Sequence, residues 1–245
     1  MSATDDLRTI GVLGGMSSES TVAYYRQIDQ GINDALGGHA AGELLIRSVN
    51  FGEIERFIQT EQWETAGEYL AAAAQDLEAG GAEFIVMATN TMHKVAPAII
   101  RAISIPFVHI VDVTADAIQN AGIETVGLIG TQTTMEASFY RNRLDKYGID
   151  VVVPDPADRE AVDTIIFDEL TDGIIRDESR DRYLDVVDDL VAAGADGVVL
   201  GCTEIELLIE QADRPDVPLF DTTTLHVNRA VEYSLGERTE FIDTN

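Results

Sequence analysis

The chain resembles itself, and this internal duplication is the feature that most limits what it can fold into. The segment TIGVLGG from Thr9 matches TVGLIGT, 116 positions later, and GAEFIVMATNT from Gly81 matches GADGVVLGCTE, 113 positions later. A third segment, IPFVHI from Ile105, matches VPLFDT, 112 positions later. Chance can produce one such match, since each is a buried strand with its turn. Three matches in the same order favour a tandem duplication.

Two kinds of hydrophobic pattern alternate along the chain. Short runs rich in β-branched residues predict strands at Thr9–Leu13, Glu43–Val49, Phe84–Ala88, Phe107–Val111, Thr125–Ile129, Val151–Val153, Gly197–Leu200 and Pro218–Phe220. Longer amphipathic stretches predict helices at Ser20–Leu36, Glu61–Glu78, Thr114–Asn120, Met135–Tyr147 and Arg180–Ala193. Strands that alternate with helices are typical of parallel sheets covered on both faces.

We therefore predict an α/β fold of two pseudo-symmetric duplicated lobes, each a mainly parallel sheet flanked by helices. The first lobe should comprise residues 1–113 plus 226–245, with 226–236 returning to it as a helix, and the second residues 114–225. Similar lobes with short connections tend to pack about a pseudo-twofold axis, so equivalent strand ends should face each other across a cleft. Ligands bind at the carboxyl ends of parallel strands. The duplication sets Thr89 opposite Cys202 there.

The charge of the chain argues against nucleic acid as a partner. There are 44 acidic residues and 16 Lys and Arg, which gives a net charge of −28. Phosphate binding needs clustered basic residues, and the only lysines are Lys94 and Lys146. The acidic residues are spread along the chain rather than gathered in a tail, which favours a salt-adapted, halophilic surface. A hydrophobic content of 45% excludes disorder as the explanation.

The composition also bears on the setting of the protein. No apolar run approaches the roughly 20 residues that span a bilayer, and the acidic start MSATDDLRTI is unlike a signal peptide. We expect a cytoplasmic protein with no membrane partner. Cys202 is the only cysteine, which excludes an intramolecular disulfide and a cysteine-rich metal site. The four histidines are scattered without HxxxH spacing, so we expect no metal.

The glycines of GVLGGMSSEST, which begins at Gly11, resemble a phosphate loop only weakly. The segment is not GxGxxG, and no GK[ST] occurs. We interpret these glycines as permitting a tight turn and close approach by a small ligand. Ser17 and Ser18 are the predicted caps of the helix that follows.

Two short polar motifs follow predicted strands, at positions where loops carry function. Thr89, Asn90 and Thr91 follow one strand, and GCTE from Gly201 follows another. Their side chains suit helix caps, and the same helix ends suit a carboxylate ligand. A lone cysteine is commonly a small buried side chain. At a helix N-terminus, however, Cys202 would have a lowered thiol pKa and act as a base or a nucleophile.

Five motifs together resemble the aspartate/glutamate racemase family, in its aspartate racemase branch: GGMSSESTVAYYRQI, ATNTMHK, GTQTTMEASFYRNRL, IIFDEL and LGCTEIELL. The resemblance runs from about Thr9 to Val231. It implies a two-lobed pseudo-symmetric fold, a homodimer, no cofactor and no metal. It also implies one cysteine in each lobe on either side of the substrate α-carbon, at the positions of Thr89 and Cys202.

The sequence departs from the family pattern in three places. Thr89 replaces the first cysteine, and its hydroxyl can donate a proton but is a very poor base. Glu204 stands where the glutamate racemase branch has histidine. The lysine that often precedes IIFDEL in members accepting aspartate is absent, which leaves Arg47 and Arg159 as candidate substitutes.

The resemblance implies a cofactor-independent amino-acid racemase with an aspartate- or glutamate-like substrate. The Cys202 thiolate would remove the α-proton, and Thr89 would act on the opposite face, so that one direction, expected from L, is faster. The remaining site residues would bind the substrate: Met16, Asn90, Thr91, Thr134, Thr203 and Glu204. Two alternatives remain open, a single-cysteine decarboxylase or isomerase of dicarboxylic acids and a non-catalytic amino-acid-binding protein.

Overall fold

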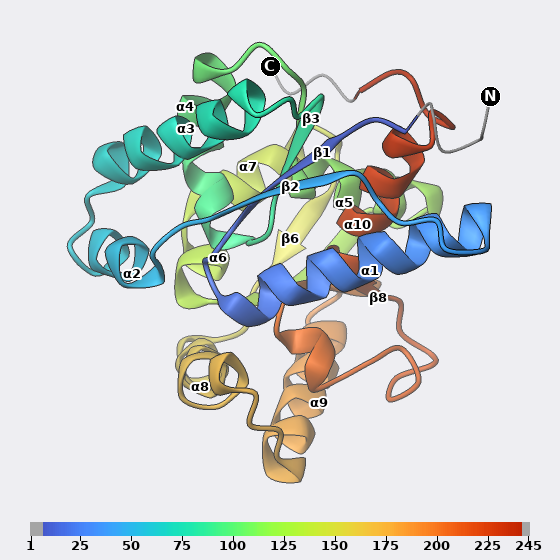
Figure 1. Ribbon diagram of the computed structural model, residues 1–245. Coiled ribbons are helices and arrows are strands. Elements are labelled where there is room, and N and C mark those ends of the chain that lie inside the picture. Colours follow the sequence, from blue (N-terminus) through green and yellow to red (C-terminus); the bar gives the residue numbers. More distant parts are fainter. Residues whose placement is uncertain (1–6, 242–245) are drawn as a thin grey trace. The chain divides into compact units, whose positions relative to one another are not determined.

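The structure is a computed structural model that describes residues 7–241. The chain divides into two compact units. Unit 1 holds the described residues up to Ile110 and from His226 onward, and unit 2 is Val111–Leu225. Figure 1 shows the elements of both units in sequence colours. The polypeptide therefore crosses between the units twice, at 110/111 and at 225/226.

Unit 1 is built on a four-stranded parallel sheet in the order β2-β1-β3-β4. Its strands are β1 (Ile10–Gly14), β2 (Leu44–Ser48), β3 (Phe84–Met87) and β4 (Phe107–Val108). Its helical segments are α1 (Ser18–Leu36), α2 (Phe51–Gln59), α3 (Trp63–Ala79), the 3₁₀ helix η1 (Thr91–Val95) and α4 (Ala96–Ala102). Most of α10 (Thr222–Ser234) also belongs to this unit.

Apolar side chains on both faces of this sheet explain why helices cover both. Leu13, Ile85 and Met87 belong to a core shared with α2, α3 and α4. On the other face Phe84 contacts Tyr233 of α10, with ring centroids 5.9 Å apart. A near-continuous apolar strand sequence is what burial on two faces requires.

Unit 2 repeats this plan. Its sheet is parallel with the order β6-β5-β7-β8. The strands are β5 (Thr125–Gly130), β6 (Asp150–Val152), β7 (Gly197–Gly201) and β8 (Leu219–Asp221). The helical segments are α5 (Ile110–Asn120), α6 (Gln132–Glu136), α7 (Ser138–Asp145), α8 (Pro156–Asp168), η2 (Leu170–Asp172), α9 (Asp177–Ala192) and η3 (Ile205–Leu207).

The two sheets share one strand order, in which the first and third strands of each unit lie side by side at the centre. The duplicated segments found in the sequence form these central pairs, β1 with β3 and β5 with β7. Two four-stranded parallel sheets flanked by helices confirm the predicted α/β fold class. The common order in both units is what a tandem duplication produces.

Several predicted elements need correction. The predicted strand Phe107–Val111 ends at Val108 because α5 already begins at Ile110. The predicted helix Met135–Tyr147 is two helices, since Ala137 has extended backbone with φ −71° and ψ 142°. The predicted helix Glu61–Glu78 begins at Trp63 instead. Three helices, α2, α4 and α8, were not predicted.

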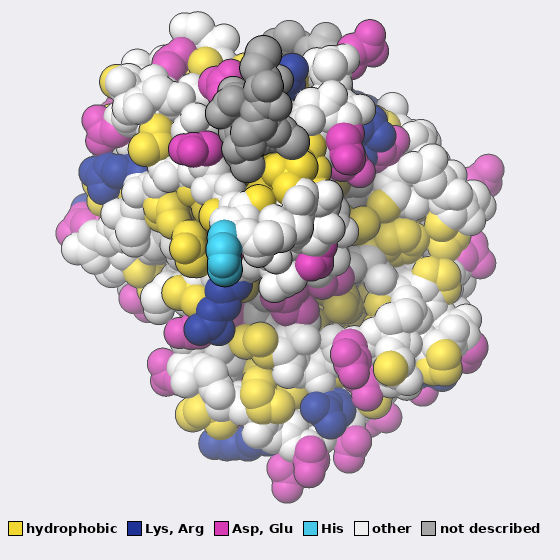
Figure 2. Space-filling model, turned by 45° about the vertical axis from the view of Figure 1, so that its right-hand side comes forward, with side chains coloured by type: hydrophobic (Ala, Val, Ile, Leu, Met, Phe, Trp, Pro, Cys, Tyr) yellow, Lys and Arg dark blue, Asp and Glu magenta, His cyan; other side chains and the backbone are white. Residues whose placement is uncertain are grey.

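The acidic residues are distributed over the surface. Figure 2 shows Asp and Glu side chains scattered over one face of the molecule, with far fewer Lys and Arg between them. Among residues 7–241, no helix is both long enough and apolar enough to cross a membrane.

Candidate active site

The loop after β1 turns sharply at Gly15. This residue has φ +86°, and a Cβ added to it would lie 2.4 Å from the carbonyl oxygen of Val49. The position therefore requires glycine, which confirms the predicted tight turn. The N–H of Gly15 donates to Thr21 Oγ1 at 2.8 Å, so this amide is already used within the protein. Ser17 is the cap of α1, because its hydroxyl accepts from the N–H of Ser20 at 3.2 Å.

Ser18, the other predicted cap, is instead an exposed first residue of α1. Between the turn and the cap lies Met16, which is buried in the core of unit 1.

The strand order of unit 1 brings this loop and the Thr89 motif to the same edge of the sheet. The strand order reverses here, because β2 lies on one side of β1 and β3 and β4 lie on the other, and such a switch point is where open parallel sheets bind ligands. The N–H of Ala88 donates to the carbonyl of Leu13 at 2.9 Å, so the two strands stay paired to their ends. Thr89 follows, 7% exposed, with its own N–H donating to the carbonyl of Met87 at 2.9 Å. Met16 and Thr89 thus share the switch point of unit 1.

Unit 2 forms the equivalent edge at the ends of β5 and β7. Gly130 pairs with Gly201, and a Cβ on Gly130 would lie 2.7 Å from the carbonyl oxygen of Gly201. Thr131 caps α6 by accepting from the N–H of Thr134 at 3.3 Å, and Thr134 is fully buried. Cys202 comes directly after β7 and is 8% exposed. Thr134 and Cys202 thus share the switch point of unit 2.

Glu204 accepts two hydrogen bonds at this edge. One of its carboxylate oxygens accepts from the Cys202 thiol at 3.0 Å and from the Thr203 hydroxyl at 2.8 Å. Burial, and then the Glu204 charge, raise the pKa of Cys202 well above its usual range. The expectation of a lowered thiol pKa is therefore wrong. The helix after Cys202 is only the three-residue η3, which is too short to supply the dipole that would favour the thiolate.

The predicted side-chain caps after the two strands are also absent. Asn90 directly precedes η1 and Glu204 directly precedes η3, and neither side chain makes a cap hydrogen bond. Both segments are 3₁₀ helices, whose tighter turns change the geometry that a capping side chain must meet. Asn90 and Thr203 are buried, and Thr91 is partly buried.

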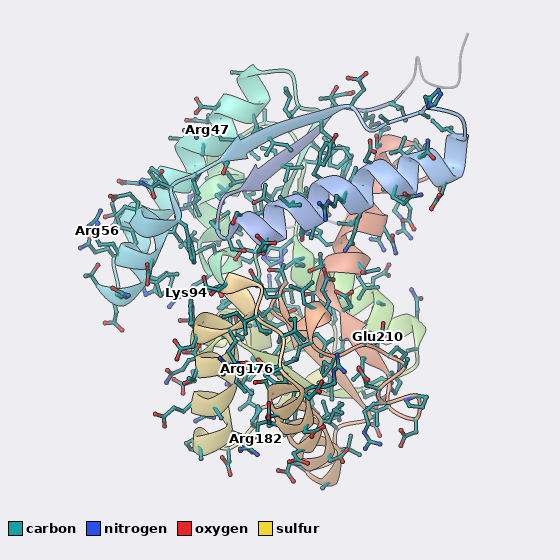
Figure 3. All side chains as sticks on the ribbon, turned by 60° about the horizontal axis from the view of Figure 1, so that its bottom comes forward. Arg47, Arg56, Lys94, Arg176, Arg182 and Glu210 are labelled. Atoms are coloured by element: carbon teal, nitrogen blue, oxygen red, sulfur yellow. The ribbon has the colours of Figure 1, made fainter. Side chains whose placement is uncertain are left out.

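The arginines considered for a substrate side chain already have acidic partners. Arg47, labelled on β2 in Figure 3, pairs with Asp76 at 3.1 Å. Arg159 of α8 pairs with Glu136 at 3.3 Å and donates to the carbonyl of Pro154 at 3.2 Å.

Sequence reasoning missed a cluster of buried histidines in unit 1. His93, four residues beyond Thr89, lies with its ring 4.6 Å from that of His109 and 6.0 Å from that of His226. His226 Nδ1 lies 2.7 Å from the Tyr24 hydroxyl. Burial lowers the pKa of His226 to about 4, so it is neutral at physiological pH. The four-residue spacing of His93 from Thr89 was the only signal in the sequence, and it is a weak one.

Among residues 7–241, no group of three or more His, Cys, Asp or Glu side chains is placed to bind a metal ion.

Comparison with known proteins decides the family. A family model described as Asp/Glu/Hydantoin racemase matches residues 13–230, nearly the whole chain. The chain belongs to the Asp/Glu/hydantoin racemase family. This confirms the resemblance found in the sequence, and membership makes the chain an enzyme of the racemase class, an isomerase.

Solved structures of the family share the fold. A protein from Yersinia pestis, provisionally described as an Asp/Glu racemase, is 48% identical with a TM-score of 0.87, covering 94% of this chain and 100% of its own. An aspartate racemase homologue from Pyrococcus horikoshii is 36% identical with a TM-score of 0.82, covering 93% of this chain and 99% of its own.

Curated relatives include racemases of differing substrate. The broad specificity amino-acid racemase RacX of Bacillus subtilis is 23% identical over 87% of this chain and 92% of its own length. The matched glutamate racemases are covered less completely, and the chain spans about half the length of the one from Persephonella marina (55%).

Proposed function

We propose that this chain is a cofactor-independent amino-acid racemase in which Cys202 removes the α-proton and Thr89 serves the opposite face. Family membership supports the reaction class. The observation that carries the proposal is the position of Cys202, a hydrogen-bonded thiol at the carboxyl end of a central strand of unit 2. Thr89 lies two residues beyond the end of the equivalent strand of unit 1, β3. That both side chains act on one substrate is part of the proposal.

The chemical step moves one proton off the α-carbon and another onto it. The Cα–H bond breaks, its proton passes to the Cys202 sulfur, and its electron pair is delocalised into the α-carboxylate as an enediolate-like species. The Thr89 hydroxyl, or a water that it relays, then protonates the other face. Cys202 afterwards releases the abstracted proton to solvent, and Thr89 or its water regains one from solvent, which restores the starting state. The reaction is an isomerisation, so no oxidant or reductant is needed.

Glu204 has a defined part in this scheme. It accepts a hydrogen bond from the Cys202 thiol in the resting enzyme, and its charge keeps the thiol pKa high. A thiolate of high pKa is scarce at neutral pH but is a strong base when formed. Only a small fraction of Cys202 is therefore ionised at neutral pH, but that thiolate is basic enough to remove a proton from a weakly acidic Cα–H.

The substrate would be held mainly by neutral groups. The Thr91 hydroxyl and the backbone N–H groups of Asn90, Thr91 and Thr203 would bind the α-carboxylate, as donors that strengthen when the enediolate forms. Met16 and Thr134 would line the site. We propose an aspartate- or glutamate-like side chain, with Arg47 or Arg159 reaching its carboxylate by exchanging its present acidic partner.

Kinetic asymmetry follows from the Thr/Cys pair. Thr89 returns a proton readily but removes one poorly, since its hydroxyl is not measurably ionised near neutral pH. At saturating substrate, the enantiomer that presents its α-hydrogen to Cys202 has the larger kcat, and we propose that this is the L form. Its KM is larger in the same proportion, because an equilibrium constant of one requires equal kcat/KM in the two directions. At equilibrium the two enantiomers are still equal, because a catalyst leaves the equilibrium constant unchanged.

The proposal extends to the setting of the enzyme. We propose a homodimer that works in the cytoplasm, with a surface adapted to high salt as its net charge of −28 favours.

A substrate panel tests the proposed function. Each L- and D-amino acid, with malonates and maleate, is incubated in D₂O, and loss of the α-proton signal is followed by nuclear magnetic resonance. We expect exchange and inversion with an acidic amino acid, and neither in Cys202→Ala. Turnover of a malonate or maleate alone would assign a decarboxylase or isomerase instead. An increase in melting temperature with ligand, without any exchange of the α-proton, would indicate a non-catalytic amino-acid-binding protein instead.

A further inference from the structure

His93 lies at the centre of unit 1, directly beyond the Thr89 motif. It belongs to η1 and is 1% exposed. Its ring packs against two others, with centroids 5.5 Å from Phe107 and 4.6 Å from His109. Close packing of this kind leaves the imidazole little freedom to tilt or shift.

Both ring nitrogens of His93 contact the backbone. Nδ1 lies 2.7 Å from the carbonyl oxygen of Thr89, and Nε2 accepts from the N–H of Ile110 at 3.3 Å. A carbonyl oxygen can only accept, so Nδ1 must carry the proton. The N–H of Ile110 can only donate, so Nε2 must carry the lone pair. The two contacts agree on one neutral tautomer, Nδ1–H.

These bonds control the backbone of Thr89. Its N–H donates to the carbonyl of Met87, and its carbonyl accepts from His93, so both of its peptide groups are held. Ile110 is the first residue of α5, where an N–H lacks a partner within its own helix. One imidazole therefore ties the Thr89 turn to the start of α5, at the point where the chain leaves unit 1.

We propose that His93 is a positioning residue for Thr89, which it serves by fixing the peptide from which the proton-donating hydroxyl projects. This inference rests on the proposed function. Without the His93 bond the Thr89 peptide can rotate, and the hydroxyl loses its alignment with the substrate carbon. Small misplacements of a reacting group reduce rates by up to about a hundredfold. Removal of the proton by Cys202 does not depend on this bond.

The selective consequence separates positioning from general destabilisation. In D₂O, a carbanion formed by Cys202 either gains a deuteron on the Thr89 face, giving the opposite enantiomer, or regains one from Cys202, giving labelled starting material. Loss of Thr89 alignment slows only the first route. The ratio of deuterium in recovered substrate to inverted product therefore rises, whereas a loss of folded protein lowers both together.

Two variants of His93 differ in whether they keep the hydrogen bond to Thr89. The amide of His93→Asn reaches the position of Nδ1 and retains a donor to Thr89, and His93→Gln reaches the position of Nε2 and loses that donor. We expect His93→Gln to raise the exchange-to-inversion ratio about tenfold or more, and His93→Asn to stay within about twofold of the unmodified enzyme. His226→Gln, which alters the same buried cluster but not the Thr89 bond, serves as the control for stability.

The outcomes are distinct. An unchanged ratio in folded His93→Gln, or an equal rise in both His93 variants, overturns the inference while leaving the proposed function standing. Absence of both exchange and inversion in the unmodified enzyme overturns the proposed function, and the inference with it. If His93→Gln does not fold, ¹⁵N spectra of histidine-labelled unmodified enzyme decide: an Nδ1–H tautomer for His93 supports the inference, and an Nε2–H tautomer overturns it.

Discussion

At the scale of single residues, the proposed mechanism depends on a thiol whose surroundings oppose its ionisation. Cys202 is buried and hydrogen-bonded to Glu204, and both features raise its pKa. A base of high pKa reaches its reactive form only as the pH rises. The activity of the enzyme should therefore be limited, near neutral pH, by how much thiolate is present.

This predicts an alkaline pH profile for racemisation. Because the Cys202 pKa is raised, kcat/KM should climb steadily with pH between about 6 and 9. Glu204→Gln removes the opposing charge, which lowers the thiol pKa and moves the rising limb to lower pH. Steady-state rates of both proteins across this range provide the measurement. A flat profile in the unmodified enzyme, or a limb that moves to higher pH in Glu204→Gln, would contradict the account.

A second residue, His226, predicts how stability depends on pH. Its neutral ring faces the Tyr24 hydroxyl, the Val108 carbonyl, Arg229 and the ring of His93. Its pKa is about 4 in the folded protein, below the ordinary value of about 6.5. Between these values the unfolded chain binds the proton more readily, so the free energy of unfolding falls as pH falls. The full loss is about 3 kcal/mol.

The matched variant is His226→Gln, which has no titrating ring. Its free energy of unfolding, measured with denaturant at several pH values, should approach that of the unmodified protein as the pH is lowered from about 6.5 to about 4. A difference between the two proteins that stays constant over this window would show that the His226 ring is not kept neutral by the fold.

At the scale of elements, the β1–α1 turn depends on one glycine. Gly15→Ala places a methyl group on a left-handed backbone and against the carbonyl oxygen of Val49. Gly173 has φ +70° with open space around it, so Gly173→Ala carries only the conformational cost, about 1–2 kcal/mol. We expect Gly15→Ala to cost at least about 3 kcal/mol by denaturant unfolding. Equal costs would show that the turn adjusts freely.

The strands were predictable because a strand that is buried on both faces has a continuous run of apolar residues in its sequence. All eight predicted strands overlap observed ones, from β1 to β8. Helices with a narrow buried stripe were harder to predict. The helix α8 buries only Asp158, Val162 and Ile166. Its start could have been predicted, because the cap residue Asp155 is a typical N-cap residue. Asn50 marks the start of α2 in the same way.

The site was predictable only in part. Thr89 and Cys202 stood out because the duplication aligns them at equivalent strand ends. The protonation state of Cys202 could not be predicted from the sequence, because it depends on burial and on the length of the helix that follows. His93 was overlooked, since only the folded turn brings its ring to the carbonyl of Thr89. Contacts made through the backbone leave little trace in side-chain patterns.

At the scale of the whole molecule, the net charge of −28 predicts a strong response to salt. Screening lengths fall from about 30 Å at 0.01 M salt to about 3 Å at 1 M, which suppresses repulsion among the surface carboxylates. We expect the melting temperature to rise markedly over this range of potassium chloride. Replacing the exposed Asp145, Glu160 and Asp168 with their amides should reduce the rise. Equal melting temperatures at low and high salt would refute the salt-adapted surface.

The most direct test of the racemase assignment is the initial rate of inversion from each enantiomer of the best acidic substrate, measured at saturating concentration so that the rate reports kcat. Chiral chromatography would measure it for the unmodified enzyme, Thr89→Cys and Cys202→Ala. We predict a faster rate from the L form in the unmodified enzyme, a gain in the slower direction for Thr89→Cys, and no inversion for Cys202→Ala. Equal initial rates from both enantiomers in the unmodified enzyme, or full activity in Cys202→Ala, would show that another residue is the base.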